Sequence, residues 1–259
     1  LGVENVDLKF VTKDTIFPSR RQYVRACNNI SFEIFEGETF GLVGESGSGK
    51  STIARAITGL YPPDTGKIFF EGIDLTALKG EHERRPLRRQ MQMVFQNPYS
   101  SMNPRMKVRD IIAEPIRFHK LASSESQIEG IVSDLLDHVG LGRGAGVKYP
   151  HARALATRPR FLICDEPTSA LDVSVQAQIL NLLKDLQQEL GLTMLFISHD
   201  LPVIRQMCDR IGVMQHGHLV EVAETEKLFT NAGHEYSRKL ISLMPEFKGM
   251  SREGLEIAS

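Results

Sequence analysis

One short run of residues has the types and the spacing to bind a polyphosphate. It fits the pattern G-x-x-x-x-G-K-[ST] and reads Gly44-Glu45-Ser46-Gly47-Ser48-Gly49-Lys50-Ser51. Glycines let successive backbone N–H groups curl around phosphate oxygens without a clash from Cβ, and a helix that follows points its positive end at the same anion. Lys50 would reach the β- and γ-phosphates of ATP, and the Ser51 hydroxyl would ligate Mg²⁺. We therefore expect residues 44–51, together with Thr52, to bind Mg-ATP.

A pair of carboxylates is the second candidate for chemistry. The apolar run 161–164 is followed at once by Asp165 and Glu166. At the carboxyl edge of a parallel sheet both would face a ligand. Asp165 suits a direct or indirect magnesium role, and Glu166 can accept a hydrogen bond from the water that attacks the γ-phosphate, as base or orienter. Taken alone, such a pair is more often a helix cap or a turn, but the glycine loop upstream favours the catalytic interpretation.

The elements around these residues predict the fold class. The apolar segment 40–43 predicts a buried strand that leads into the glycine loop, and helical spacing of apolar residues follows until Pro62-Pro63. Strands are expected at 161–164 and 193–197, with a helix from 173 to about 190 between them. Strands that alternate with helices indicate a mainly parallel sheet. We therefore expect an α/β fold of the P-loop NTPase (RecA-like) class.

Patterns in the rest of the chain predict further elements attached to this core. Alternating apolar residues before position 35 indicate an N-terminal antiparallel β subdomain, and helical periodicity from about 108 to 139 indicates a helical insertion. A hairpin at 211–220 and a helical tail follow. No linker separates independent domains, so we expect one domain over residues 1–259, in which a core (about 1–105 and 152–222) carries a helical subdomain (106–151) and a C-terminal tail (223–259).

Composition excludes several classes of protein. The 31 Lys and Arg residues nearly cancel the 32 Asp and Glu residues, so no global field favours nucleic acid or anionic lipid. The three cysteines, at 27, 164 and 208, have no spacing typical of zinc or iron-sulfur sites. The longest apolar runs are too short to cross a membrane, and the first five residues lack the basic start and hydrophobic stretch of a signal peptide.

Residues 165–172 read Asp-Glu-Pro-Thr-Ser-Ala-Leu-Asp, which resembles the Walker B and D-loop segments of ABC ATPases. The resemblance covers nearly the whole chain and implies further site residues. Gln96 resembles the Q-loop glutamine that touches magnesium and the water, and His199 resembles the H-loop histidine that contacts the γ-phosphate. The family also stacks an aromatic residue on adenine; Phe10 is the first candidate and Tyr23 the second, and core packing is an equal alternative for either.

Two segments are similar to a narrower branch, the oligopeptide, dipeptide and nickel importers. They are residues 96–105 and residues 233–240, the latter reading Gly-His-Glu-Tyr-Ser-Arg-Lys-Leu. The resemblance implies an ATPase subunit that pairs with a second ATPase subunit, as a homo- or heterodimer. It also implies transmembrane permease subunits, docked on the helical insertion, and indirectly a solute-binding protein. Such a subunit would be cytoplasmic and peripheral on the inner face of the plasma membrane.

One feature of the family is missing. ABC ATPases carry a signature resembling L-S-G-G-Q before Walker B, whereas this chain passes from Tyr149-Pro150-His151 directly to Ala152. In the family that segment reaches the ATP bound by the opposite subunit. Either a segment of the natural protein is absent from this sequence, which the matching flanks favour, or the protein lacks it. The missing segment keeps open one alternative to a transport ATPase, a nucleotide-binding subunit with little hydrolysis. A second alternative is a soluble ABC ATPase acting on nucleic acid, against which stand the nearly neutral net charge and the absence of zinc-type cysteines.

Overall fold

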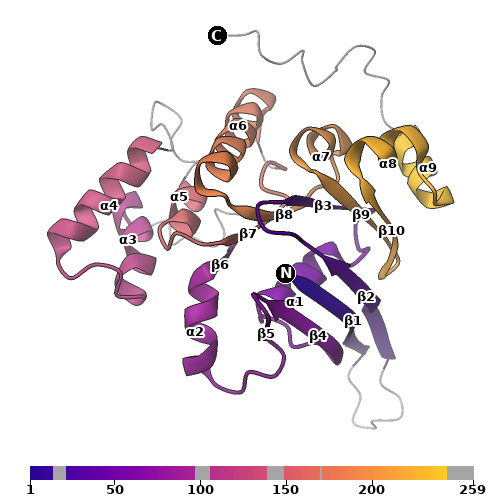
Figure 1. Cartoon of the computed structure of the whole chain (residues 1–259), viewed down its shortest axis with the longest axis horizontal. Helices are drawn as coiled ribbons and strands as arrows, with labels where there is room; N and C mark the ends of the chain where they lie inside the picture. The colour runs from indigo at the N-terminus through magenta and orange to yellow at the C-terminus, as the bar shows by residue number, and fades with distance from the viewer. Residues whose placement is uncertain (14–21, 97–105, 139–148, 170, 244–259) are drawn as a thin grey trace.

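The computed structural model describes residues 1–13, 22–96, 106–138, 149–169 and 171–243. A six-stranded sheet has the order β10-β9-β3-β8-β7-β6 (Figure 1). The five strands from β9 to β6 run parallel to one another, and β10 pairs antiparallel with β9 at one edge. Their bounds are Thr39–Val43 for β3, Met91–Val94 for β6, Phe161–Asp165 for β7, Thr193–Ile197 for β8, Arg210–Gln215 for β9 and His218–Glu224 for β10. The expected parallel α/β core is confirmed, and the glycine loop and the carboxylate pair follow strands that end at one edge of this sheet.

The central strands are apolar without interruption because both faces of the sheet are covered. Along β7, Phe161 and Ile163 pack on one side, whereas Leu162 and Cys164 pack on the other. Figure 1 shows α6 (Val173–Leu190) and α7 (Leu201–Met207) over one face, and α1 (Lys50–Ile57) with the second sheet over the other. The predicted helix at 173–190 and strand at 193–197 therefore have the bounds expected.

The second sheet is antiparallel, with the order β2-β1-β4-β5. β1 (Gly2–Lys13) and β2 (Gln22–Glu33) confirm the expected N-terminal β subdomain. The sequence patterns had not predicted the next elements, β4 (Thr65–Phe70), β5 (Ile73–Asp74) and α2 (Glu81–Gln90). β4 and β5 complete this sheet, and α2 leads into β6, which ends two residues before Gln96.

The helical insertion expected from about 108 to 139 contains two helices. α3 spans Val108–Phe118 and α4 spans Glu125–His138, and Lys120 between them takes a left-handed backbone (φ 53°). Together with α5 (Tyr149–Leu155) they share a separate core that includes Ile112, Ile128 and Ala152. α5 crosses the expected boundary at 151/152, so the subdivision of the chain stays a prediction.

The hairpin and tail end the described chain. β9 and β10 meet at His216-Gly217, whose positive φ angles of 48° and 82° suit a tight hairpin turn. α8 (Thr225–Asn231) and α9 (Glu235–Ser242) follow. No helix among the described residues is both long and apolar enough to cross a membrane.

The three cysteines, Cys27, Cys164 and Cys208, are free and buried. Burial raises the pKa of the Cys27 and Cys164 thiols to about 12 in each case. Thiols of this kind are poor nucleophiles at neutral pH.

Candidate nucleotide-binding site

The glycine loop lies between β3 and α1 and is enclosed by backbone from two other strands. At Gly44 (φ 150°) an added Cβ would come within 2.1 Å of the Met214 carbonyl oxygen on β9. At Gly49 (φ 105°) it would come within 2.2 Å of the Ala26 carbonyl oxygen on β2. Only glycine fits either position, both because of the angle and because of the close carbonyl. The loop conformation is therefore set by contacts from remote parts of the chain.

Helix α1 presents its amino end to this loop. Gly49 is its N-cap and contributes no side-chain hydrogen bond, and the first turn carries no acidic residue. The first N–H groups of a helix lack partners within it and carry partial positive charge. This end of α1 is thus suited to an anion, as the predicted role of residues 44–52 requires.

Lys50 is buried and bends back over the loop. Its Nζ donates to the carbonyl oxygens of Gly44 (2.8 Å) and Glu45 (2.9 Å). Burial lowers the pKa of the Lys50 ammonium, whereas the carboxylates of Glu166 and Asp165 act to raise it. A phosphate at the loop would supply the counter-charge that this buried ammonium needs.

Asp165 ends β7 opposite Ser51. The Ser51 hydroxyl donates to Asp165 Oδ1 at 2.9 Å, and Oδ2 is buried with no hydrogen-bond partner. Burial raises the pKa of the Asp165 carboxyl, and the Ser51 hydrogen bond opposes this. A buried carboxylate oxygen without a partner, beside a hydroxyl, offers the hard oxygen ligands that Mg²⁺ takes.

The protein supplies only part of a magnesium shell. Among the residues that the structure describes, no three His, Cys, Asp or Glu side chains gather into a metal site. Mg²⁺ usually keeps few protein ligands and completes its shell with water and substrate phosphates. The Ser51 and Asp165 pair fits an ion that arrives with a nucleotide.

Glu166 brings the three predicted catalytic side chains together. Its Oε2 accepts a hydrogen bond from Gln96 Nε2 at 2.8 Å, and its Oε1 lies 3.3 Å from His199 Nδ1. Its backbone is left-handed (φ 49°), which costs energy for a residue with Cβ, and its N–H donates to the Ile197 carbonyl oxygen at 2.9 Å. That bond to β8 holds the turn that directs the carboxylate toward its two partners.

The two aromatic candidates, Phe10 on β1 and Tyr23 on β2, lie on paired strands. The Phe10 ring packs edge-on against Tyr61, with centroids 5.2 Å apart. Tyr23 is half exposed, and the Lys9 ammonium lies 5.7 Å from its ring centre. Tyr23 precedes by three residues Ala26, whose carbonyl oxygen faces Gly49. The adenine role of either residue stays a prediction.

Three backbone or side-chain supports of the loop were not foreseen from the sequence. The Gly217 N–H donates to the Ser48 carbonyl oxygen at 3.0 Å, and the Tyr236 hydroxyl accepts the Glu45 N–H at 3.2 Å. The Met214 carbonyl completes the set at Gly44. Tyr236 belongs to the segment 233–240 that carried the branch resemblance, but nothing in the sequence placed any of the three at the loop, because each lies far along the chain from it. Asn97 to Arg105 and Ala170, which belong to segments that carried the resemblance, lie outside the described residues.

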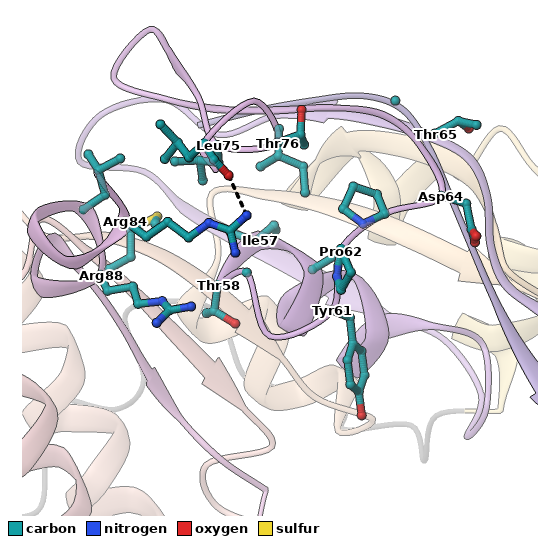
Figure 2. Close-up of a pocket in the computed structure, with 18 residues that line it drawn as sticks. Ile57, Thr58, Tyr61, Pro62, Asp64, Thr65, Leu75, Thr76, Arg84 and Arg88 are labelled. Carbon is teal, nitrogen blue, oxygen red and sulfur yellow. Dashed lines mark hydrogen bonds between the residues drawn. The ribbon is translucent and has the colours of Figure 1, made fainter. Parts of the chain in front are cut away.

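A separate cavity of about 150 Å³ lies beyond the far end of α1 (Figure 2). Ile57, Leu75 and Leu87 contribute apolar walls, and Arg84 lines it while donating to the Leu78 carbonyl oxygen at 2.6 Å. It shares no residue with the glycine loop. This cavity therefore does not mark the candidate nucleotide site.

Comparison with known proteins agrees with this geometry. The family model "ABC transporter" matches residues 27–169. The chain is 48% identical over 256 residues to the oligopeptide transport ATP-binding protein OppF of Streptococcus mutans, covering 94% of this chain and 81% of that protein. It is 44% identical to the dipeptide transport ATP-binding protein DppF of Lactococcus lactis, covering 94% and 80%. Among solved structures it resembles the dimeric post-hydrolysis ATP-binding cassette MJ0796 bound to ADP and Pi, with a TM-score of 0.76, 27% identity, and coverage of 86% and 98%.

Proposed function

This chain belongs to the ABC transporter family, and from that premise we propose that it is the ATP-hydrolysing subunit of a peptide importer. The observation that carries the proposal is the convergence of Gln96 and His199 on the Glu166 carboxylate, beside a glycine loop built for phosphate. The family hydrolyses ATP, and a related cassette was captured after hydrolysis. The relatives named above are peptide-transport ATP-binding proteins, which supports a peptide as the solute.

ATP would bind with its phosphates in the loop. Backbone N–H groups of residues 44–52 and the Lys50 ammonium would hold the β- and γ-phosphates, with the amino end of α1 adding positive potential. Ser51 and Asp165 would hold Mg²⁺, which neutralises charge on the transferring phosphate when it is bound. Tyr23 is the better-placed candidate for adenine, because Phe10 is already packed against Tyr61.

Hydrolysis would then depend on Glu166. Its carboxylate accepts a proton from, or orients, the water that attacks the γ-phosphate in line. Gln96 holds one carboxylate oxygen at 2.8 Å and would also reach the magnesium side of the site. His199, on the other oxygen, is more than half exposed and so can turn toward the γ-phosphate.

Partners follow from the family. We propose a dimer with a second ATPase subunit, by analogy with the dimeric cassette MJ0796. The dimer would act on transmembrane permease subunits, and a solute-binding protein would deliver the peptide. The subunit would then lie at the inner face of the plasma membrane. The peptide-transport relatives favour this hypothesis over the alternative of a soluble ABC ATPase that acts on nucleic acid.

The substitution Glu166→Gln tests the proposal. It keeps the size of the side chain but removes the carboxylate, so Mg-ATP binding should persist while turnover falls by roughly 10²- to 10⁴-fold. Binding is measured by calorimetry and turnover by phosphate release, for the chain together with the membrane subunits that co-purify with it. Glu189→Gln, at an exposed position on α6, is the matched control and should change neither. Undiminished turnover in the Glu166 variant would remove the assigned role.

A further inference from the structure

We propose that Tyr236 is a positioning residue for the glycine loop, so that helix α9 helps to set where Lys50 sits. This inference rests on the proposed function, since it concerns the same nucleotide site. Tyr236 lies in the first turn of α9, and its side chain is buried (7% exposed). Its hydroxyl accepts the backbone N–H of Glu45 at 3.2 Å across 191 residues of sequence.

The peptide group between Gly44 and Glu45 forms hydrogen bonds through both its N–H and its carbonyl oxygen. The Glu45 N–H belongs to the same planar unit as the Gly44 carbonyl. That carbonyl oxygen accepts Lys50 Nζ at 2.8 Å. Holding the N–H edge against Tyr236 therefore keeps the carbonyl edge directed at the ammonium.

Without such a hold this peptide group could rotate at little cost. Gly44 has no Cβ to restrict its backbone, and its φ of 150° is one that few other residues adopt. A rotation that turned the Glu45 N–H away would also turn the Gly44 oxygen away from Lys50. The Tyr236 hydroxyl removes this freedom before a nucleotide arrives, which lowers the ordering cost of binding.

Helix α9 is itself fixed to the sheet that supports the loop. The Glu221 carboxylate, on β10, accepts the N–H groups of Gly233 (2.7 Å) and His234 (3.0 Å) just before α9 begins. His234 Nδ1 then accepts the Tyr236 N–H at 3.2 Å and caps the helix. β10 pairs with β9, whose Met214 carbonyl crowds Gly44. Tyr236 therefore contacts the loop from a helix whose start is hydrogen-bonded to β10.

A tyrosine that only filled the core would stabilise the fold without affecting the dissociation constant for the nucleotide. The substitution Tyr236→Phe separates the two roles, because it keeps the ring and removes the hydroxyl. We expect the dissociation constant for Mg-ATP to rise by roughly 2- to 10-fold, the range for one neutral hydrogen bond. Amide hydrogen exchange in a peptide spanning residues 44–50 should accelerate, and the melting temperature should fall by only about 2–4 °C, as for the loss of one neutral hydrogen bond.

The matched control is Thr225→Val at the start of α8. It removes another buried hydroxyl, which donates to the Cys208 carbonyl oxygen at 2.6 Å, in the same C-terminal part of the chain but off the loop. It should lower stability and leave the Mg-ATP dissociation constant unchanged. Equal effects of the two variants on that constant, or no effect of Tyr236→Phe, would overturn the inference.

Two further arms keep the experiment decisive. If Tyr236→Phe does not fold, Glu221→Gln replaces it, since it weakens the anchor of α9 but keeps the hydroxyl: a raised dissociation constant supports the inference and an unchanged one overturns it. Wild-type protein is titrated in parallel. No binding of Mg-ATP by the wild type refutes the proposed function, whereas normal wild-type binding with unaffected variants refutes only the role of Tyr236.

Discussion

The contact between Gly49 and β2 predicts that two glycines of the same loop respond very differently to one added methyl group. Gly49 and Gly47 both have left-handed backbones, with φ of 105° and 80°. A Cβ on Gly49 would meet the Ala26 carbonyl oxygen at 2.2 Å, whereas a Cβ on Gly47 would meet nothing within 4 Å. Gly47→Ala is therefore a control that shares the backbone strain but not the clash.

The magnitudes follow from the two effects. A left-handed backbone costs an alanine about 1–2 kcal/mol, which applies to both variants. Forcing a methyl group into a filled space costs about 1–3 kcal/mol more, and at Gly49 the neighbour is backbone and cannot swing away. We expect Gly49→Ala to lower the free energy of unfolding by about 2–5 kcal/mol and Gly47→Ala by about 1–2 kcal/mol.

Thermal unfolding without nucleotide checks this ordering directly. For a domain of this size, 1 kcal/mol corresponds to about 2–4 °C, so Gly49→Ala should melt roughly 2–12 °C below Gly47→Ala. Mg-ATP binding should fall in Gly49→Ala as the loop moves away from β2. Equal melting temperatures for the two variants would mean that Ala26 does not confine the loop, and the account of why Gly49 is glycine would fail.

Two more perturbations follow. Ser51→Ala removes the hydroxyl that donates to Asp165 at 2.9 Å. The Mg²⁺ concentration for half-maximal ATP binding should rise roughly tenfold or more, as for a lost hydrogen bond to a charged group, while ATP binding without Mg²⁺ should change little. An unchanged Mg²⁺ dependence would exclude Ser51 as a ligand. His119 has a pKa below its ordinary value of 6.5 because of burial and then the nearby Arg85 and Arg89, so its contribution to stability is present above that value and is lost as pH falls through the lower folded pKa. His119→Gln should therefore lose less stability than wild type between pH 7 and 5, as measured by urea unfolding, and parallel losses would contradict the lowered pKa of His119.

The catalytic parts of the site were predictable because they are local. Residues 44–51 and the Asp165-Glu166 pair each form a contiguous pattern next to a strongly apolar strand, and strand periodicity places both at one sheet edge. Gln96 and His199 carry little signal alone and were identified through the resemblance to ABC ATPases, in which residues of these types stand in this order and spacing. Their meeting at Glu166 is a tertiary fact that the order only implies.

The elements that were missed lack the apolar periodicity on which the predictions relied. α2 buries only Leu87, and its ten residues are mostly charged. Its ends instead carry acidic residues in the first turn and basic residues in the last, which stabilise a helix through its dipole. The break between α3 and α4 was not predicted because apolar spacing continues on both sides of it. It is marked by the left-handed backbone of Lys120 and by hydrogen bonds at the start of α4, where the Gln127 N–H donates to Ser124 Oγ at 3.3 Å and Gln127 Oε1 accepts the Ser123 N–H at 2.8 Å.

The missing signature segment bears on the partner's site more than on this chain's own. Immediately after the point of departure, Ala152 and Ala156 are buried, and Thr157 Oγ1 donates to the Arg89 carbonyl oxygen at 3.0 Å. β7 then pairs in register with β6 and β8 and delivers Asp165 and Glu166 to the loop. The site formed by this chain is therefore assembled without the segment. If the protein truly lacks it, a homodimer would offer no signature to either ATP, whereas a heterodimer could still complete this chain's site with a signature from the other subunit. The mass of the intact protein shows whether the protein itself lacks the segment or contains it although the given sequence does not. Turnover measured with and without a second, different ATPase subunit shows whether the homodimer or the heterodimer hydrolyses ATP.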